Sequence, residues 1–266
     1  MRNWGFYFTA RTHPDEVGSE DLGLVLADLK MRLKKIEDGD DTKLQRNQEL
    51  AHRRSRLLLY GRYVCFRAFL ECAAARDGEI TESHRERWLL IQLAPLKLLR
   101  KDIFRAFTRE IGRASSEYLD GAIQEESNEI KNLLGPLTLF YVLDEAQALI
   151  KDLDYFRSDT DSAKCRPILS PIIKDWGSRD QNLIVSGTGL SMLEVQSVVG
   201  SAVAKDGSGN EAKTVTEVGG FDNEGDQQAY LEQYLPPGFL DTSTGKEIRP
   251  RVGYWLRGRF VFNAAL

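Results

Sequence analysis

The order of apolar and polar positions along the chain predicts a strand, a long helical region, and then strands and helices in alternation. The segment Trp4–Ala10 (WGFYFTA) is short, aromatic and β-prone, which predicts a strand close to the first residue. Helical spacing follows from Ser19, a candidate cap, and the stretch Leu44–Leu134 is rich in Leu, Arg, Ala and Glu. Within that stretch we expect helices near residues 45–76, 82–94, 96–113 and 115–133.

After Gly135-Pro136 the pattern changes to short apolar runs. Residues 138–143 predict a buried strand, and we expect a helix directly after it. CRPILSPIIKDWGSRD predicts a helix interrupted by Pro171, and NLIVSGTGLS, from Asn182, predicts a second buried strand. Buried strands that alternate with helices indicate an α/β fold with a parallel sheet and crossover connections.

Two adjacent carboxylates, Asp144 and Glu145, follow the first of these buried runs. The carboxyl edge of a parallel sheet is where ligands of open α/β folds bind. In P-loop nucleotidases the first acid at such a place holds hydrated Mg²⁺, and the second orients and deprotonates the attacking water. Mg²⁺ suits this arrangement because it keeps several waters and needs only one or two carboxylates. An alternative stays open, in which Asp144 caps the next helix and Glu145 meets its dipole.

Two hydroxyls, Ser186 and Thr188, follow the second buried run, with Ser186 42 positions after Asp144. A hydroxyl at the end of the neighbouring strand could contact a γ-phosphate or the attacking water, as a sensor residue does. The alternative is a glycine-rich turn that caps a helix. Together the two strands favour descent from a nucleotide-binding site.

A phosphate-binding loop of the form G-x-x-x-x-G-K-[ST] is the missing partner of these acids. The nearest match is Gly207–Thr214 (GSGNEAKT), with Ala212 where the second glycine belongs. It follows the acidic strand and runs into a β-prone segment, whereas a phosphate loop follows the first strand and opens a helix. We therefore expect it to be a surface loop.

Charge and composition narrow the function classes. With a net charge of −4, the 266-residue chain does not favour a general affinity for nucleic acid, although residues 51–113 carry 14 Lys and Arg against 7 Asp and Glu. That basic stretch indicates either solvated helix faces or an anion-binding surface. No apolar run of 18 residues and no signal-peptide core occur, so we expect an intracellular chain, cytoplasmic or nuclear, without a membrane partner.

Cysteine and histidine usage disfavours a structural metal site. The three cysteines (Cys65, Cys72 and Cys165) lack C-x-x-C spacing, and the three histidines lie far apart in the sequence. We expect reduced thiols, with Cys65 and Cys72 in a helical core.

Four segments together resemble the P-loop NTPase module of fungal Crinkler-type proteins. They are NWGFYFTA, FYVLDEAQAL, LIVSGTGLS and YWLRGRF, which occur in the family's order and span nearly the whole chain. The resemblance implies an ATP- and Mg²⁺-binding module of a signalling or effector protein. Asp144 would hold the metal, Glu145 would be the base, and Ser186 and Thr188 the sensor.

The same resemblance implies one P-loop NTPase-like domain over residues 1–266, with a helical insertion at 44–134 and a partial lid at 220–266. It makes Arg257 and Arg259 candidates for a γ-phosphate sensor or a lid contact, the alternative being exposed arginines at a helix end. In the family the phosphate loop lies just before the equivalent of NWGFYF, where this chain begins. ATP binding and hydrolysis are therefore expected to be impaired, which leaves enzymatic activity open.

Two rival hypotheses remain. The chain could be a catalytically inactive remnant that binds a protein partner, which the missing loop favours. It could also be a helicase-like ATPase fragment whose basic region contacts nucleic acid. A helicase core needs a second RecA-like domain, for which the sequence has no room.

Overall fold

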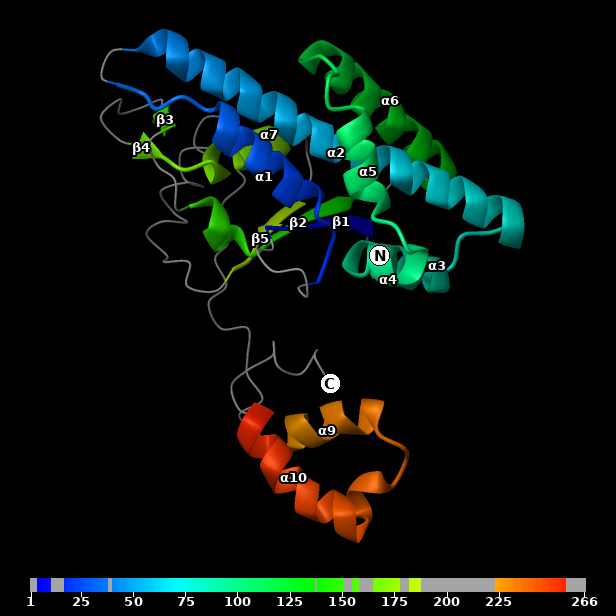
Figure 1. The fold of residues 1–266 in the computed structure, drawn as a ribbon. Helices are drawn as coiled ribbons and strands as arrows, with labels where there is room; N and C mark the ends of the chain where they lie inside the picture. Colours follow the sequence, from blue (N-terminus) through cyan, green and yellow to red (C-terminus); the bar gives the residue numbers. More distant parts are fainter. Residues whose placement is uncertain are drawn as a thin grey trace. The chain divides into compact units, whose positions relative to one another are not determined.

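The computed structural model describes residues 4–10, 17–37, 40–136, 138–150, 155–157, 165–177, 182–187 and 223–256. The chain forms two units, Met1–Ala212 and Lys213–Leu266, each with its own internal contacts (Figure 1). Within the described residues, helices predominate and no helix is long and apolar enough to cross a membrane.

The first unit is built on a three-stranded parallel sheet. Its strands are β1 (Trp4–Thr9), β2 (Leu139–Asp144) and β5 (Asn182–Val185), in the order β1-β2-β5. Thr9 pairs with Asp144, and the register of β2 with β5 ends one residue earlier, so all three strands finish at one edge. The expected α/β class, parallel sheet and crossover connections are confirmed.

The helical region of the sequence is also confirmed, with one difference. The elements that connect β1 to β2 are α1 (Asp21–Arg32), α2 (Asp41–Asp77), α3 (Glu82–Leu93), α4 (Pro95–Leu99), α5 (Ile103–Glu110) and α6 (Ser116–Leu134). The single helix expected at 96–113 is two helices, because Arg100 adopts a left-handed conformation (φ 56°) that ends α4. Asp102 then caps α5 by accepting a hydrogen bond from the Arg105 N–H at 3.0 Å.

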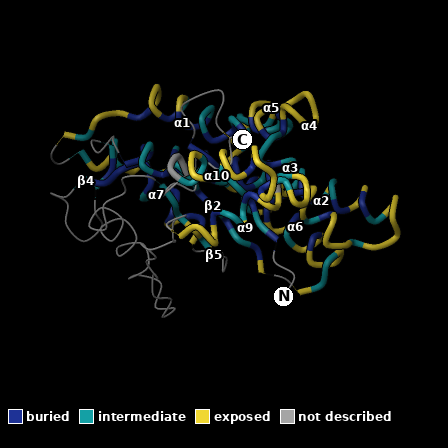
Figure 2. The backbone as a smooth tube through the Cα atoms, turned by 90° about the horizontal axis from the view of Figure 1, so that it is seen from below, coloured by how far each residue is buried: buried dark blue, intermediate teal, exposed yellow. Residues whose placement is uncertain are grey.

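The long helix α2 organises the first unit, and Figure 1 shows it crossing the whole unit with α5 and α6 beside it. Asp40 caps its start by accepting from the Lys43 N–H, and Gly78, at φ 78°, ends it in the left-handed region that favours glycine. Its inner face, which includes Leu58 and Phe66, is fully buried and packs in the main core (Figure 2).

Strand alternation gives the sheet two different faces. Phe6, Phe8 and Tyr141 are fully buried on one face, where Phe6 stacks on Tyr141 at 5.7 Å between ring centroids. Helix α7 (Leu169–Gly177) closes this face, with Trp176 4.4 Å from the Phe8 ring. The other face carries the half-buried positions of β1 and β2, and polar side chains of the sheet lie there.

A buried ion pair joins several elements beside the sheet. Arg62 on α2 is fully buried and contacts Asp21 on α1 at 2.8 Å. Its guanidinium lies over the Phe104 ring at 3.8 Å and the Phe8 ring at 4.8 Å, which adds cation–π attraction to the pair.

Two details after β2 differ from the sequence predictions. Pro171 lies in the first turn of α7 rather than interrupting it, because an N–H in the first turn has no acceptor within the helix. The strand predicted as buried, β5, is partly exposed, and the side chain of Ile184 is 46% exposed. Short strands β3 (Phe156–Arg157) and β4 (Cys165–Arg166) pair in antiparallel fashion.

The second unit is a helical hairpin of α9 (Glu224–Tyr234), the 3₁₀ turn η2 (Phe239–Asp241) and α10 (Ser243–Leu256). Leu231 and Leu240 form its small core. Gly245 permits the close approach of α10 to η2, because a Cβ atom there would lie 2.7 Å from the Leu240 Cα. Helix α9 confirms the helix that the sequence NEGDQQAYLEQYL predicts.

Candidate functional site

The acidic pair lies at the carboxyl edge of the sheet, as the sequence predicts. Asp144 is the last residue of β2, the central strand, and Ser186 directly follows β5. Backbone hydrogen bonds join the strand ends, with the Ser186 N–H donating to the Leu143 carbonyl at 2.9 Å and the Ala10 N–H to the Asp144 carbonyl at 3.0 Å. The edge is therefore a fixed platform for the side chains above it.

Three donors converge on the Asp144 carboxylate. Tyr7 Oη donates to Oδ2 at 2.6 Å, and Ser186 Oγ donates to Oδ1 at 2.7 Å. The Glu145 N–H donates to Oδ1 at 3.0 Å. Hydrogen bonds to an ionised acceptor are the strong ones, so this cluster orients the carboxylate firmly.

Tyr7 and Asp144 meet because the alternation of both strands places them on the same face. Tyr7 pairs with Val142 in the register, and Asp144 lies two residues further along β2, within reach of a tyrosine side chain. Burial raises the pKa of Tyr7, and so do its hydrogen bond to Asp144 and the charges of Asp144 and Glu145. The Tyr7 hydroxyl therefore stays protonated and remains a donor to Asp144.

Glu145 occupies an unusual backbone position. Its φ of 55° and ψ of 33° lie in the left-handed region, which is uncommon for a residue with a side chain. The Ala146 N–H donates to the Ser186 carbonyl at 3.0 Å, and Gln147 Nε2 donates to the Glu145 carboxylate. The helix expected after the acids is the 3₁₀ turn η1 (Ala146–Leu149). Among the described residues, the Asp144 carboxylate accepts a backbone hydrogen bond from the Glu145 N–H and from no N–H within η1.

The structure thus brings together Asp144, Glu145 and Ser186 among the residues that the sequence selected. The other candidates, Thr188, Arg257 and Arg259, lie outside the described residues, as does the loop Gly207–Thr214. The residue that sequence reasoning missed is Tyr7. In the sequence, Tyr7 is marked only by its hydroxyl, between two phenylalanines. Its partner, Asp144, becomes evident only from the register of β1 with β2.

The donor chemistry of this edge fits Mg²⁺. The Asp144 and Glu145 carboxylates and the Ser186 hydroxyl supply hard oxygen ligands, and each Asp144 oxygen can accept more than one hydrogen bond. Neither carboxylate forms an ion pair within the described part of the chain, so no protein cation competes for this negative charge there. No group of three or more His, Cys, Asp or Glu residues that could hold a metal gathers in the described part of the chain. Asp144 would hold Mg²⁺ as an ion that keeps several of its waters.

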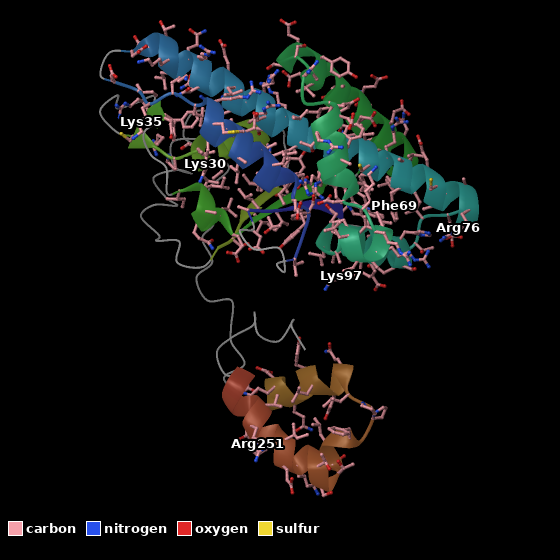
Figure 3. All side chains as sticks on the ribbon, viewed as in Figure 1. Lys30, Lys35, Phe69, Arg76, Lys97 and Arg251 are labelled. Carbon is pink, nitrogen blue, oxygen red and sulfur yellow. The ribbon has the colours of Figure 1, made fainter. Side chains whose placement is uncertain are left out.

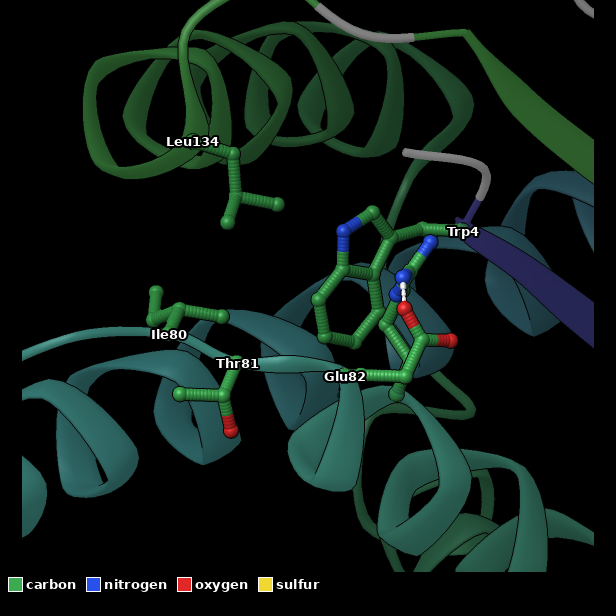
Figure 4. A pocket seen from close by; sticks show the side chains of 6 residues that line it. Trp4, Ile80, Thr81, Glu82 and Leu134 are labelled. Atoms are coloured by element: carbon green, nitrogen blue, oxygen red, sulfur yellow. Dashed lines mark ion pairs between the residues drawn. The ribbon is translucent and has the colours of Figure 1, made fainter. Parts of the chain in front are cut away.

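A small cavity lies beside Trp4, the first residue of β1 (Figure 4), whereas Asp144 pairs with Thr9, the last residue of that strand. Its volume is about 140 Å³, and its lining residues are Trp4, Ile80, Thr81, Glu82, Arg85 and Leu134. Arg85 and Glu82 form an ion pair at its rim. Such a volume holds a few water molecules but no nucleotide, so this cavity adds nothing to the site at the carboxyl edge.

Comparisons of the chain with protein-family models, with curated proteins and with solved structures give no match. Function must therefore be argued from the residues at the carboxyl edge.

Proposed function

We propose that the chain is a nucleotide- and Mg²⁺-binding module of the P-loop NTPase type, akin to the Crinkler module that its sequence resembles. The observation that carries the proposal is the position of Asp144 and Glu145 at the carboxyl end of the central parallel strand, with Ser186 2.7 Å from Asp144 on the next strand. Ligands of parallel α/β sheets bind at this edge.

Each residue then has a distinct role. A bound Mg²⁺ would neutralise negative charge on the nucleotide's phosphates. Asp144, oriented by Tyr7 and Ser186, would hold the hydrated ion, and Glu145 would orient and deprotonate the attacking water. Tyr7 is a positioning residue, because it acts through Asp144.

The proposed activity is weak in this chain by itself. The sequence contains no complete G-x-x-x-x-G-K-[ST] loop to wrap the phosphates with backbone N–H groups. We therefore expect low affinity for Mg-ATP and little hydrolysis until such a loop is supplied.

Calorimetric titration with Mg-ATP tests this function. The chain is compared with Asp144→Asn, which keeps the shape of the side chain and removes its charge, and with Glu129→Gln on the exposed side of α6 as a control. The same substitutions are repeated in a version that carries an upstream glycine-lysine loop. We expect the loop to raise affinity, Asp144→Asn to abolish Mg²⁺-dependent binding, and Glu129→Gln to change nothing. Equal binding by Asp144→Asn would contradict the proposal.

A second candidate function follows from the hydrogen bonds of the Asp144 carboxylate. Both Asp144 oxygens already accept hydrogen bonds from Tyr7, Ser186 or the Glu145 N–H. Such a cluster is also what a purely structural edge would contain, in an inactive remnant that serves protein interaction. Under this alternative, neither the chain nor the version with the added loop binds Mg-ATP. Asp144→Asn then lowers the free energy of unfolding and has no effect on nucleotide binding.

A further inference from the structure

Five leucines on the neighbouring helices α3 and α4 are exposed, and we call them the leucine patch. They are Leu89, Leu90, Leu96, Leu98 and Leu99, and their exposed fractions run from 41% to 52%. Soluble proteins rarely keep large apolar side chains grouped on their surface unless the group contacts something.

The sequence exposes these leucines for a clear structural reason. Helix α3 turns Trp88 and Gln92 toward the edge of β1, where both donate to the Gly5 carbonyl, so Leu89 and Leu90 face away. Pro95 then ends α3 and opens α4, and all residues from Leu96 to Lys101 are exposed. Because these residues are exposed, no other described element covers this side of α4.

Positive charge is mixed into the same segment. Between Glu86 and Asp102 the chain carries Arg87, Lys97, Arg100 and Lys101 and no acidic residue. Figure 3 shows Lys97 projecting from α4 away from the helices of the unit. Lys97 stands between two leucines of the patch in the sequence, and Arg100 and Lys101 follow directly after Leu99.

We propose that the leucine patch and its four cations dock reversibly on the surface of an anionic lipid bilayer. Headgroup phosphates and carboxylates would bind the cations, while the leucines enter the boundary between headgroups and acyl chains. Lysine is depleted from the centre of protein–protein interfaces, and two of the four cations, Lys97 and Lys101, are lysines, which argues against a protein partner. The expectation of no membrane partner rested on the absence of a spanning segment, and adsorption to a surface needs none.

The electrostatic contribution of each cation is small, so we expect the contact to be weak and dependent on salt. Each Lys or Arg close to an anionic membrane strengthens binding about fivefold, so two charge reversals should weaken it by more than about 25-fold. Raising the ionic strength should reduce binding because the attraction decays within a Debye length.

Co-sedimentation of the full chain with phosphatidylcholine vesicles, with and without phosphatidylserine, tests the proposal. One variant, Lys97→Glu with Lys101→Glu, reverses charge, and a second, Leu98→Ser with Leu99→Ser, removes apolar surface. The control combines Arg46→Glu with Met31→Ser, two exposed positions on other helices. Circular dichroism checks that each variant is folded. All three pairs change exposed residues, so folding should be kept.

We expect the chain to bind only vesicles that contain phosphatidylserine. Both patch variants should lose this binding, and the control variant should bind as the unaltered chain does. Three outcomes would overturn the proposal. The chain could bind neither vesicle, it could bind both equally, or the leucine variant could bind as well as the unaltered chain. In the first case a protein partner with an acidic surface becomes the occupant to seek.

Discussion

At the scale of single residues, the site depends on a tyrosine that no motif would select. Tyr7 donates a hydrogen bond to Asp144 Oδ2 at 2.6 Å, and it orients the carboxylate from the neighbouring strand. A hydrogen bond to a charged group contributes about 1.5–3 kcal/mol, and partial exposure places Tyr7 toward the lower end.

Tyr7→Phe is therefore expected to lower the free energy of unfolding by about 1–2 kcal/mol near neutral pH. Because the pKa of Tyr7 is raised above its ordinary value of 10.0, the unfolded chain releases this proton at a lower pH than the folded chain. The contribution is complete below pH 10.0 and decreases as the pH rises further. Urea unfolding at several pH values measures the difference between the two proteins, with Tyr155→Phe as the control. A difference that grew above pH 10.0 would show that the assigned bond is wrong.

At the scale of elements, helix α3 protects the outer edge of β1. Gln92 is almost fully buried, and its side chain accepts from the Tyr7 N–H at 2.9 Å and donates to the Gly5 carbonyl at 3.1 Å. Trp88 Nε1 donates to the same carbonyl at 3.0 Å. Side chains of a helix thus replace the partner strand that an exposed edge would otherwise recruit.

Gln92→Leu should cost about 1–3 kcal/mol in the free energy of unfolding, because the partly buried Tyr7 N–H loses its acceptor. The Gly5 carbonyl keeps its bond from Trp88. Gln124→Leu on α6 removes an exposed bond to Asn128 and should change stability by less than about 0.5 kcal/mol. Chemical unfolding compares the two variants. Equal losses would mean that the edge bonds of Gln92 contribute nothing beyond those of a surface residue.

Elements were more predictable from the sequence than the contacts between them. The apolar run before Asp144 and the helical composition of residues 44–134 suffice to locate β2 and the helical region that holds α2 to α6, since both patterns are local. The end of α4 at Arg100 was missed because a left-handed arginine has no pattern in the sequence. The exposure of β5 and the partnership of Tyr7 with Asp144 depend on sheet order and register, which are properties of the assembled sheet.

At the scale of the whole molecule, each of the two units has a hydrophobic core of its own within the described residues. Leu58 is fully buried in the main core, which spans the sheet and helices α1, α2, α3, α5, α6 and α7. Leu240 is 6% exposed in the small core of the second unit, with Leu231 as its buried neighbour. Stability in one core should therefore not depend on packing in the other.

Leu58→Ala should lower the free energy of the main unfolding transition by about 2–5 kcal/mol, through lost burial and the cavity left behind. Leu240→Ala should leave that transition within about 0.5 kcal/mol of the unaltered chain, since Leu58 and Leu240 pack in the cores of different units. Urea unfolding followed by circular dichroism measures both, and the double variant should show additive losses. If Leu240→Ala lowers the main transition as much as Leu58→Ala does, the two units unfold as one, and the second unit then supports the sheet that carries Asp144.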